Sequence, residues 1–225
     1  VSVVDAFRGC VSIRNISIPS TMTDINTNFS DSKNIQSITV AEGNPIYSSP
    51  QGCNAIVKSG VLVLGCKATT IPSSVYRIGA NSFNAIDTLS IPEGVRELED
   101  YAFSGCDTIR KISIPSSVTQ WGEYSGPFDY CVIDTMYLNN NNTCMVGQYG
   151  EFDCLFGAEI KHMIIGEGVT RIANLTLPKE SLTIPSTLKE LGDISYAWYG
   201  TGFADRPKQV HVKDLVTWLN IIPSG

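Results

Sequence analysis

Two stretches in the middle of the chain repeat one pattern of apolar and turn residues. Residues 89–95 read L-S-I-P-E-G-V and residues 112–118 read I-S-I-P-S-S-V, and Ile114 follows its counterpart Ile91 by 23 residues. The first copy continues into A-F-S-G-C at residues 102–106. An internal period of about 20–30 residues is typical of stacked supersecondary units, so the repeat decides the fold class.

Each unit is expected to contain one short strand. The alternation Ile112-Ser113-Ile114 has the period of a strand, so Ile112 and Ile114 should point into the core and Ser113 outward. Pro115 has no N–H to give to a neighbouring strand, and we expect it to end the strand. One coil cannot bury its apolar side alone, whereas stacked coils share a continuous core.

Three regions depart from the regular period. Residues 41–66 form an insert in which two β-rich runs around Ser59-Gly60 predict a hairpin, expected on the rim of the stack and paired laterally with it. Residues 139–160 are an irregular insertion, and residues 193–225 are a modified C-terminal region in which residues 214–219 are expected to form a capping helix. We expect one domain over residues 1–225.

The repeated I-x-I-P-x-x-V followed by A-F-x-x-C resembles the BspA-like branch of the leucine-rich repeats. The matching positions are Ile18-Pro19, Ile71-Pro72, Ile91-Pro92, Ile114-Pro115 and Ile184-Pro185, with the pairs Phe7/Cys10, Phe103/Cys106 and Phe128/Cys131. The resemblance implies a right-handed leucine-rich repeat solenoid, rich in strand and coil, with one short parallel strand per repeat and a β-hairpin insert. It also implies a secreted or surface-attached microbial protein, often bacterial, that contacts host proteins or other cells.

Charge and hydropathy narrow the range of partners. The formal net charge is −6, from 16 basic and 22 acidic residues, which disfavours nucleic acid because no basic patch offers counterion release. No apolar run approaches the ~20 residues of a membrane span. No segment has the pattern of a signal peptide or an anchor.

Cysteine and histidine spacing gives no metal or catalytic motif. The chain has seven cysteines and two histidines. Cysteines at the repeat position after phenylalanine are expected to be buried thiols, although a Cys106–Cys131 disulfide is conceivable. Cys53 with Cys66, and Cys144 with Cys154, could be bridged in an oxidising location. His162 and His211 lack the converging ligands that zinc requires, so we expect no metal. A Ser–His–Asp triad is recognised by geometry and not by the order of its residues, so the sequence leaves one open, but we expect no catalytic residues and no cofactor.

The outward position of each strand is the candidate recognition surface. It carries small hydroxyl residues, interrupted toward the C-terminal half by larger side chains; in order, the row is Ser17, Thr39, Thr70, Ser90, Ser113, Tyr137, Ile164, Thr183 and His211. Hydroxyl residues are also tolerated on a solvated sheet face. Exposed aromatic residues are common anchors of interfaces, which adds Tyr196, Trp198 and Tyr199, although these could equally form an end cap.

The main hypothesis is a non-catalytic, monomeric binding module outside the cell. It would recognise a host or neighbouring-cell protein or glycan through Ser90, Ser113, Tyr137, Ile164 and His211, or through the loops near the C-terminal aromatic residues. The alternative is a structural spacer on the cell surface without a ligand of its own. An enzyme is the weakest alternative, and it predicts a deep pocket with convergent titratable groups.

Overall fold

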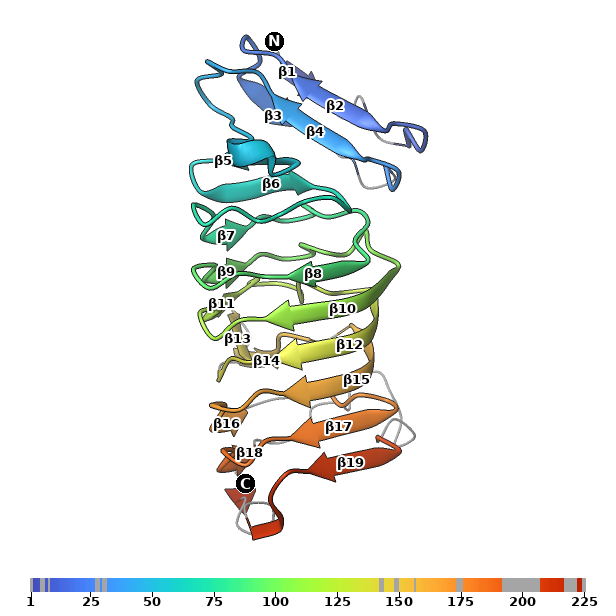
Figure 1. The fold of residues 1–225 in the computed structure, drawn as a ribbon, viewed down its shortest axis with the longest axis vertical. Helices are drawn as coiled ribbons and strands as arrows, with labels where there is room; N and C mark the ends of the chain where they lie inside the picture. Colours follow the sequence, from blue (N-terminus) through green and yellow to red (C-terminus); the bar gives the residue numbers. More distant parts are fainter. Residues whose placement is uncertain are drawn as a thin grey trace.

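The chain winds into one elongated solenoid whose coils stack along its long axis (Figure 1). The computed structural model describes residues 2–4, 7, 9–26, 29, 32–141, 144–147, 150–155, 157–172, 176–191, 207–216 and 222–223. Its N-terminal strands lie at one end of the stack and its C-terminal strands at the other (Figure 1). The stacked arrangement expected from the repeat is therefore confirmed.

One strand from each of six successive coils builds a parallel sheet, which we call the front sheet. Its order is β8 (Thr88–Ser90), β10 (Thr108–Ile114), β12 (Val132–Leu138), β15 (Glu159–Ile165), β17 (Ser181–Ile184) and β19 (Gln209–Val212). Every pair of neighbouring strands is parallel, because the chain completes a full coil and returns to the same side of the solenoid before the next front strand begins.

A second set of strands, most of them two residues long, forms two further sheets. A five-stranded sheet contains β5 (Ala55–Lys58), β6 (Val61–Gly65), β7 (Arg77–Ile78), β9 (Glu97–Leu98) and β11 (Gln120–Trp121). A three-stranded sheet contains β16 (Arg171–Ile172), β18 (Glu190–Leu191) and β20 (Ile222–Pro223). The sequence predicted β5 and β6 as the hairpin around Ser59-Gly60. It did not predict the two-residue strands of these sheets, since two residues are too few to show an alternation.

Smaller elements complete the described fold. At the N-terminal end, β2 (Asn15–Ile18) pairs with β4 (Ser37–Val40), and β1 (Ser2–Val4) pairs with β3 (Asp24–Asn26), both parallel. The short 3-10 helix η1 spans Pro50–Gly52. Within residues 139–160, β13 (Cys144–Gly147) and β14 (Gly150–Asp153) form an antiparallel hairpin. The predicted capping helix falls mostly outside the described residues, which stop at residue 216 and resume at residue 222.

The front sheet buries the side chains that the alternation predicted. Ile112 and Ile114 are fully buried. In the register of the sheet, Ile112 lies between Leu89 and Met136, which are also buried. Ser113, between the two isoleucines, remains partly exposed. The predicted inward and outward sides of this strand are confirmed.

Stacked phenylalanines fill the core behind the sheet. The Phe103 ring stacks on Phe83 at 5.2 Å between centroids and on Phe128 at 4.8 Å, with interplanar angles of 10° and 8°. All three side chains are fully buried. At the N-terminal end, Phe7 and Phe29 stack in the same way at 5.3 Å. The repeated phenylalanine therefore builds a continuous contact between coils.

The cysteines that follow the phenylalanines are thiols. The Cys106 thiol donates a hydrogen bond to the carbonyl oxygen of Phe83 at 3.5 Å, and Cys131 donates to that of Phe103 at 3.0 Å. Burial raises the pKa of Cys106 to about 12 and raises the pKa of Cys131 as well. A buried, protonated thiol is a poor nucleophile, so these residues act as core side chains.

The two candidate disulfides have different outcomes. Cys53 and Cys66 are unbridged thiols that belong to different core clusters. Cys66 donates a hydrogen bond to the carbonyl oxygen of Asn54 at 3.7 Å, and Cys53 donates to that of Ala55 at 3.8 Å. The Cys144 side chain lies outside the described part of the structure, so its pairing with Cys154 stays a prediction.

The predicted hairpin exists but does not lie on the rim. Strands β5 and β6 pair antiparallel across Ser59-Gly60, and β6 continues in parallel into β7. Ile56 and Leu62 are fully buried, Ile56 in the N-terminal core cluster and Leu62 in the larger one. The runs A-I-V and V-L-V-L are apolar on both faces of the hairpin, and such strands are covered on both sides. The hairpin therefore joins the two clusters.

Gly65 allows the hairpin to approach the phenylalanine stack. A Cβ atom built at Gly65 would lie 2.8 Å from Cζ of Phe83, which is closer than a real contact. Gly65→Ala is therefore expected to lower the free energy of unfolding by about 2 kcal/mol, because the ring of Phe83 must shift inside a packed core. Urea unfolding measures this, with Lys58→Ala on the exposed side of the hairpin as the control. Equal stability of the two variants would contradict the close packing.

Carboxylates join the turns that follow the front strands. Glu93 accepts hydrogen bonds from the backbone N–H groups of Ser116 at 3.2 Å and Ser117 at 3.1 Å in the next coil. Glu167 does the same further along, accepting from the N–H of Ser186 at 3.5 Å and its hydroxyl at 3.0 Å. Desolvation opposes the charged form of Glu93, but these hydrogen bonds hold its pKa below the ordinary value. The turns thereby fix the spacing between coils.

Candidate recognition surface on the front sheet

The register of the front sheet brings the predicted outward residues into one row. Neighbouring strands pair Ser90 with Ser113, Ser113 with Tyr137, and Tyr137 with Ile164. The row continues from Ile164 to Thr183 and from Thr183 to His211. We call this set the outer row. Five of the eight candidate ligand-binding residues of the sequence analysis therefore lie side by side on one face.

The same face carries a second row, two residues earlier in each strand. Each of the six front strands contributes one residue to this row, and neighbouring strands pair these residues in the order Thr88, Lys111, Thr135, His162, Ser181 and Gln209. We call it the flanking row. Since residues two apart in a strand point to the same side, both rows face solvent together.

The two rows meet in a mixed patch around Tyr137, which we call the central patch: Lys111, Tyr137, His162 and Ile164. The ammonium nitrogen of Lys111 lies 4.7 Å from the centroid of the Tyr137 ring, a cation–π contact. Nδ1 of His162 shares a hydrogen bond with the Ser181 hydroxyl at 2.8 Å. Tyr137 and Ile164 are only partly buried, so an aromatic ring, an aliphatic side chain, a cation and an imidazole are available to a ligand.

The predicted row does not continue without interruption to the N-terminal end. Ser17 and Thr39 pair with each other in the separate β2–β4 sheet, and Thr70 belongs to no strand. The buried hairpin between residues 53 and 66 separates that sheet from the front sheet. The candidate surface is therefore limited to the six coils from β8 to β19.

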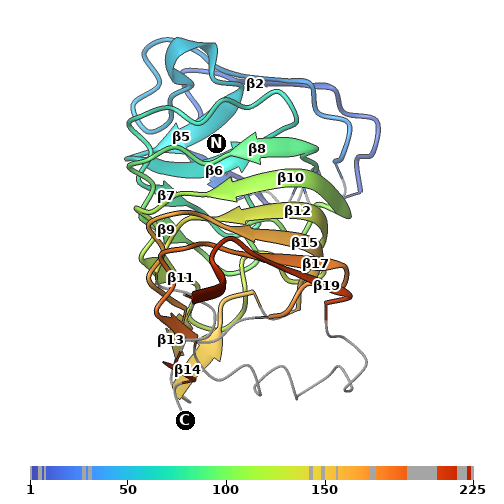
Figure 2. The ribbon, with the colours of Figure 1, turned by 60° about the horizontal axis from the view of Figure 1, so that its bottom comes forward.

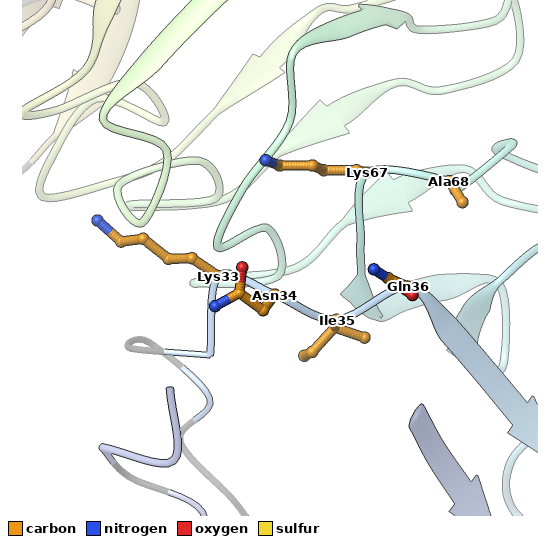
Figure 3. Close-up of a pocket in the computed structure, with 6 residues that line it drawn as sticks. All are labelled: Lys33, Asn34, Ile35, Gln36, Lys67 and Ala68. Atoms are coloured by element: carbon orange, nitrogen blue, oxygen red, sulfur yellow. The ribbon is translucent and has the colours of Figure 1, made fainter. Parts of the chain in front are cut away.

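A shallow hollow marks the break between the two sheets (Figure 3). It has a volume of about 180 Å³ and is lined by Lys33, Asn34, Ile35, Gln36, Lys67 and Ala68. The side chains of Lys33 and Lys67 extend in the same direction from the two segments that line this hollow, and Lys33 forms an ion pair with Asp107 at 2.5 Å. It is open to solvent and lacks the convergent acid, base and nucleophile that an active site needs.

A row of alternating charges lies at the start of the front strands. One residue before the flanking row, successive coils carry Asp87, Arg110, Asp134, Lys161, Glu180 and Lys208, which we call the charge ladder. Arg110 pairs with Asp87 through two hydrogen bonds, Lys161 pairs with Asp134 at 2.6 Å, and Lys208 pairs with Glu180 at 2.7 Å.

Ion pairing in the charge ladder shifts the pKa of Asp87, Glu180 and Lys161 in the direction that favours the charged form. The hydrogen bond from Arg110 lowers the pKa of Asp87, and that from Lys208 lowers the pKa of Glu180. The hydrogen bond to Asp134 raises the pKa of Lys161. The sequence analysis missed the charge ladder. Its signal in the sequence is a charged residue four positions before the last inward residue of each front strand, and the sign of this charge alternates from strand to strand.

The two histidines lie on the front face but in different rows. His162 belongs to the flanking row beside Thr135, and His211 belongs to the outer row in the last strand, β19. Within the described ranges, no group of three or more His, Cys, Asp and Glu side chains is placed to hold a metal ion. The same ranges contain no helix long and apolar enough to cross a membrane.

The C-terminal aromatic candidates cannot be placed on this surface. Tyr196, Trp198 and Tyr199 lie outside the described residues, which stop at residue 191 and resume at residue 207. Their role in binding or in capping stays a prediction.

Comparison with known proteins was made at the level of sequence and of fold. The family model described as the BspA type leucine-rich repeat region matches residues 4–53 and 64–177, in six copies. Among curated proteins, no sequence match was found.

Three solved structures resemble this chain. A leucine-rich repeat protein from Eubacterium ventriosum is 22% identical, with a TM-score of 0.54, over 80% of this chain and 50% of that one. A leucine-rich cell surface protein from Faecalibacterium prausnitzii is 16% identical, with a TM-score of 0.43, over 93% and 51% of the two chains. A leucine-rich repeat protein from Bacteroides ovatus is 16% identical, with a TM-score of 0.27, over 94% and 78%. The chain spans about half of the length of the first two proteins.

Proposed function

This chain belongs to the BspA-type leucine-rich repeat family, and from that premise we propose that it is a non-catalytic binding module displayed outside the cell. Its partner is a protein or glycan of a host or a neighbouring cell. Recognition takes place on the front sheet, through the outer and flanking rows. A solenoid suits this task, because successive coils present an extended surface on which each strand adds one set of side chains.

The observation that carries the proposal is the central patch. Tyr137 stands in a row that otherwise begins with small hydroxyl residues, and Lys111 lies over its ring at 4.7 Å. An aromatic ring beside a cation, with Ile164 in the next strand, offers stacking, apolar contact and hydrogen bonding at one place. Aromatic residues of this kind anchor many protein interfaces.

The spacer hypothesis predicts a different surface. A spacer needs only a soluble sheet face, for which serine and threonine at every outward position would suffice. The replacement of that pattern by Tyr137, Ile164 and His162 in neighbouring strands favours a binding role over a spacer.

The test is a binding screen of the purified chain against extracellular-matrix proteins and glycans. For any ligand found, Tyr137→Ala is expected to weaken binding about tenfold or more, as truncation of a central aromatic anchor does. The double variant Ser90→Arg with Ser113→Arg should also lose binding, because two long cations then cover the N-terminal half of the outer row. Tyr124→Ala is the control, since this tyrosine is 77% exposed but lies outside the front sheet.

The outcomes separate the hypotheses. A ligand that binds Tyr137→Ala and the double arginine variant as tightly as the native chain would remove the front sheet from recognition. A screen without any ligand would favour the spacer. Loss of binding in Tyr124→Ala alone would move the site to the segment between β11 and β12.

A further inference from the structure

The exposed face of the front sheet carries less negative charge than the chain as a whole. The formal net charge of the chain is −6. Neither the outer row nor the flanking row contains an aspartate or a glutamate, and the flanking row adds the cation Lys111. Each acid of the neighbouring charge ladder is paired with a cation of the ladder. A ligand on this face therefore meets a surface that is neutral to positive.

Lys111 is a cation that no carboxylate neutralises within the described part of the chain. Arg110, its neighbour in β10, already pairs with Asp87. None of the ion pairs among the described residues includes Lys111, whose ammonium nitrogen lies 4.7 Å from the centroid of the Tyr137 ring. An ammonium group has three N–H donors, so contact with one ring leaves donors for an acidic group.

The strand register places two further hydrogen-bonding side chains in line with Lys111. Thr135 lies beside it in β12, and His162 lies beside Thr135 in β15. Nδ1 of His162 is engaged with the Ser181 hydroxyl at 2.8 Å, which leaves Nε2 for a ligand. Since neighbouring strands are about 4.8 Å apart, Lys111 and His162 span about 10 Å across the sheet. A ligand with an acidic group at Lys111 therefore finds a hydroxyl and an imidazole for its other polar groups.

A ligand that contacts these residues in turn must run across the strands. Figure 2 shows the front strands from β8 to β19 side by side on one side of the solenoid. Inside the sheet, the backbone N–H and C=O groups of β10, β12 and β15 pair with the neighbouring strands. The face therefore offers a peptide no free strand edge to pair with, and recognition on it depends on side chains.

The side chains of the two rows favour a hydroxylated ligand over a protein. The core of a protein interface is apolar, and serine and lysine are depleted there. In the two rows only Tyr137 and Ile164 are apolar or aromatic, and the other positions carry hydroxyl, amide, imidazole or ammonium groups. Hydroxyl groups both donate and accept hydrogen bonds, so rows of serine and threonine match the hydroxyl groups of a polysaccharide. Charge complementarity with Lys111 favours an acidic one.

We propose that the ligand of the front sheet is an acidic polysaccharide, which lies across the strands with a carboxylate or sulfate group on Lys111. This inference rests on the function proposed above and names the chemical class of its ligand. The acidic group accepts hydrogen bonds from the Lys111 ammonium and the Thr135 hydroxyl, and the sugar beside it packs against Tyr137. A lysine ammonium is a compact point charge without the planar fork of a guanidinium, so carboxylate and sulfate both fit.

The test compares matched acidic and neutral glycans by isothermal titration calorimetry of the whole chain. The pairs are oligogalacturonate with its methyl ester, and dextran sulfate with dextran. The native chain is expected to bind at least one acidic glycan about tenfold more tightly than its neutral partner, because a hydrogen bond to a charged group contributes that much. Lys111→Met should bring the affinity for the acidic glycan down to that for its neutral partner.

The matched control is Lys58→Met. Lys58 also lies over a tyrosine ring, that of Tyr47 at 5.9 Å, but it belongs to the hairpin and not to the front sheet. This variant should keep the native preference for the acidic glycan. Both lysines are exposed, so both variants are expected to fold, which circular dichroism checks.

Three results would overturn the proposal. The first is that neither acidic glycan binds the native chain. The second is equal affinity for the acidic and the neutral member of both pairs. The third is a preference for the acidic glycan that Lys111→Met retains, which would place the acidic group elsewhere. Poly-glutamate tests the other class of ligand, and its binding in the absence of glycan binding would assign the face to an acidic protein segment instead.

Tyr137→Ala separates a failure of this inference from a failure of the proposed function. If the acidic and neutral glycans bind equally and Tyr137→Ala loses both, the front sheet stays the recognition surface and only the acidic ligand is wrong. If an acidic glycan binds the native chain, Tyr137→Ala and Lys111→Met with equal affinity, its site lies outside the front sheet, and both proposals are wrong for that ligand.

Discussion

Replacing Phe103 with alanine is expected to lower the free energy of unfolding by about 4 kcal/mol. The Phe103 ring is fully buried and stacks on Phe83 on one side and Phe128 on the other. Alanine would leave a cavity between three coils, and the stiff β-strands around it limit how far the site can collapse. The loss of stability therefore has two parts: the favourable free energy of burying the aromatic ring, and the van der Waals contacts that its two neighbours lose.

A matched control comes from the same repeat position at the end of the solenoid. Phe7 is 36% exposed and stacks on Phe29. Phe7→Ala should cost about 1 kcal/mol, since an aromatic pair at a partly solvated site contributes no more than that. Urea unfolding of both variants measures the two effects. If Phe103→Ala is no more damaging than Phe7→Ala, the phenylalanine stack is not a continuous core element.

The features that depend on local patterns were predictable from the sequence. The alternation at Ile112-Ser113-Ile114 predicted which side chains are buried, and the structure confirms it. The recurrence of phenylalanine after each strand predicted equivalent positions, which the stacking of Phe83, Phe103 and Phe128 now shows. The first rests on residues two positions apart, and the second rests on the spacing of phenylalanine and cysteine inside each unit, as in Phe103/Cys106 and Phe128/Cys131, so neither required knowledge of how distant coils align.

The features that depend on alignment between unequal coils were not predictable. The ion pairs of the charge ladder join residues that are 23, 27 and 28 positions apart: Arg110 with Asp87, Lys161 with Asp134 and Lys208 with Glu180. With a period that varies this much, only the observed strand register shows that the charges alternate. The contact of Lys111 with Tyr137 likewise depends on the strand register, which the sequence alone does not give.

The hairpin was misplaced for a related reason. Its sequence identifies two strands around a turn, but an apolar hairpin can lie on the rim or inside the core. Tertiary packing places the hairpin inside the core. Ile56 and Leu62 are fully buried in two different clusters, so the hairpin connects them. That bridge interrupts the outward row before β8, which restricts the candidate site to the C-terminal two thirds of the solenoid.

The central claim is that residues 112 and 113 face opposite sides of the front sheet, one into the core and one toward a ligand. Ile112→Arg places a cation in a fully buried position, and the cost is expected to be about 4 kcal/mol or more because nothing nearby neutralises it. For a chain of 225 residues this corresponds to a fall of about 10 °C in melting temperature.

The most direct measurement is the thermal unfolding of Ile112→Arg beside that of Ser113→Arg. The two variants introduce the same side chain at neighbouring positions of one strand, so they differ only in the face that receives it. We expect Ile112→Arg to melt about 10 °C or more below the native chain, and Ser113→Arg to melt within about 2 °C of it. Unfolding of Ser113→Arg, or a native melting temperature for Ile112→Arg, would contradict the register and remove the outer row as a recognition surface.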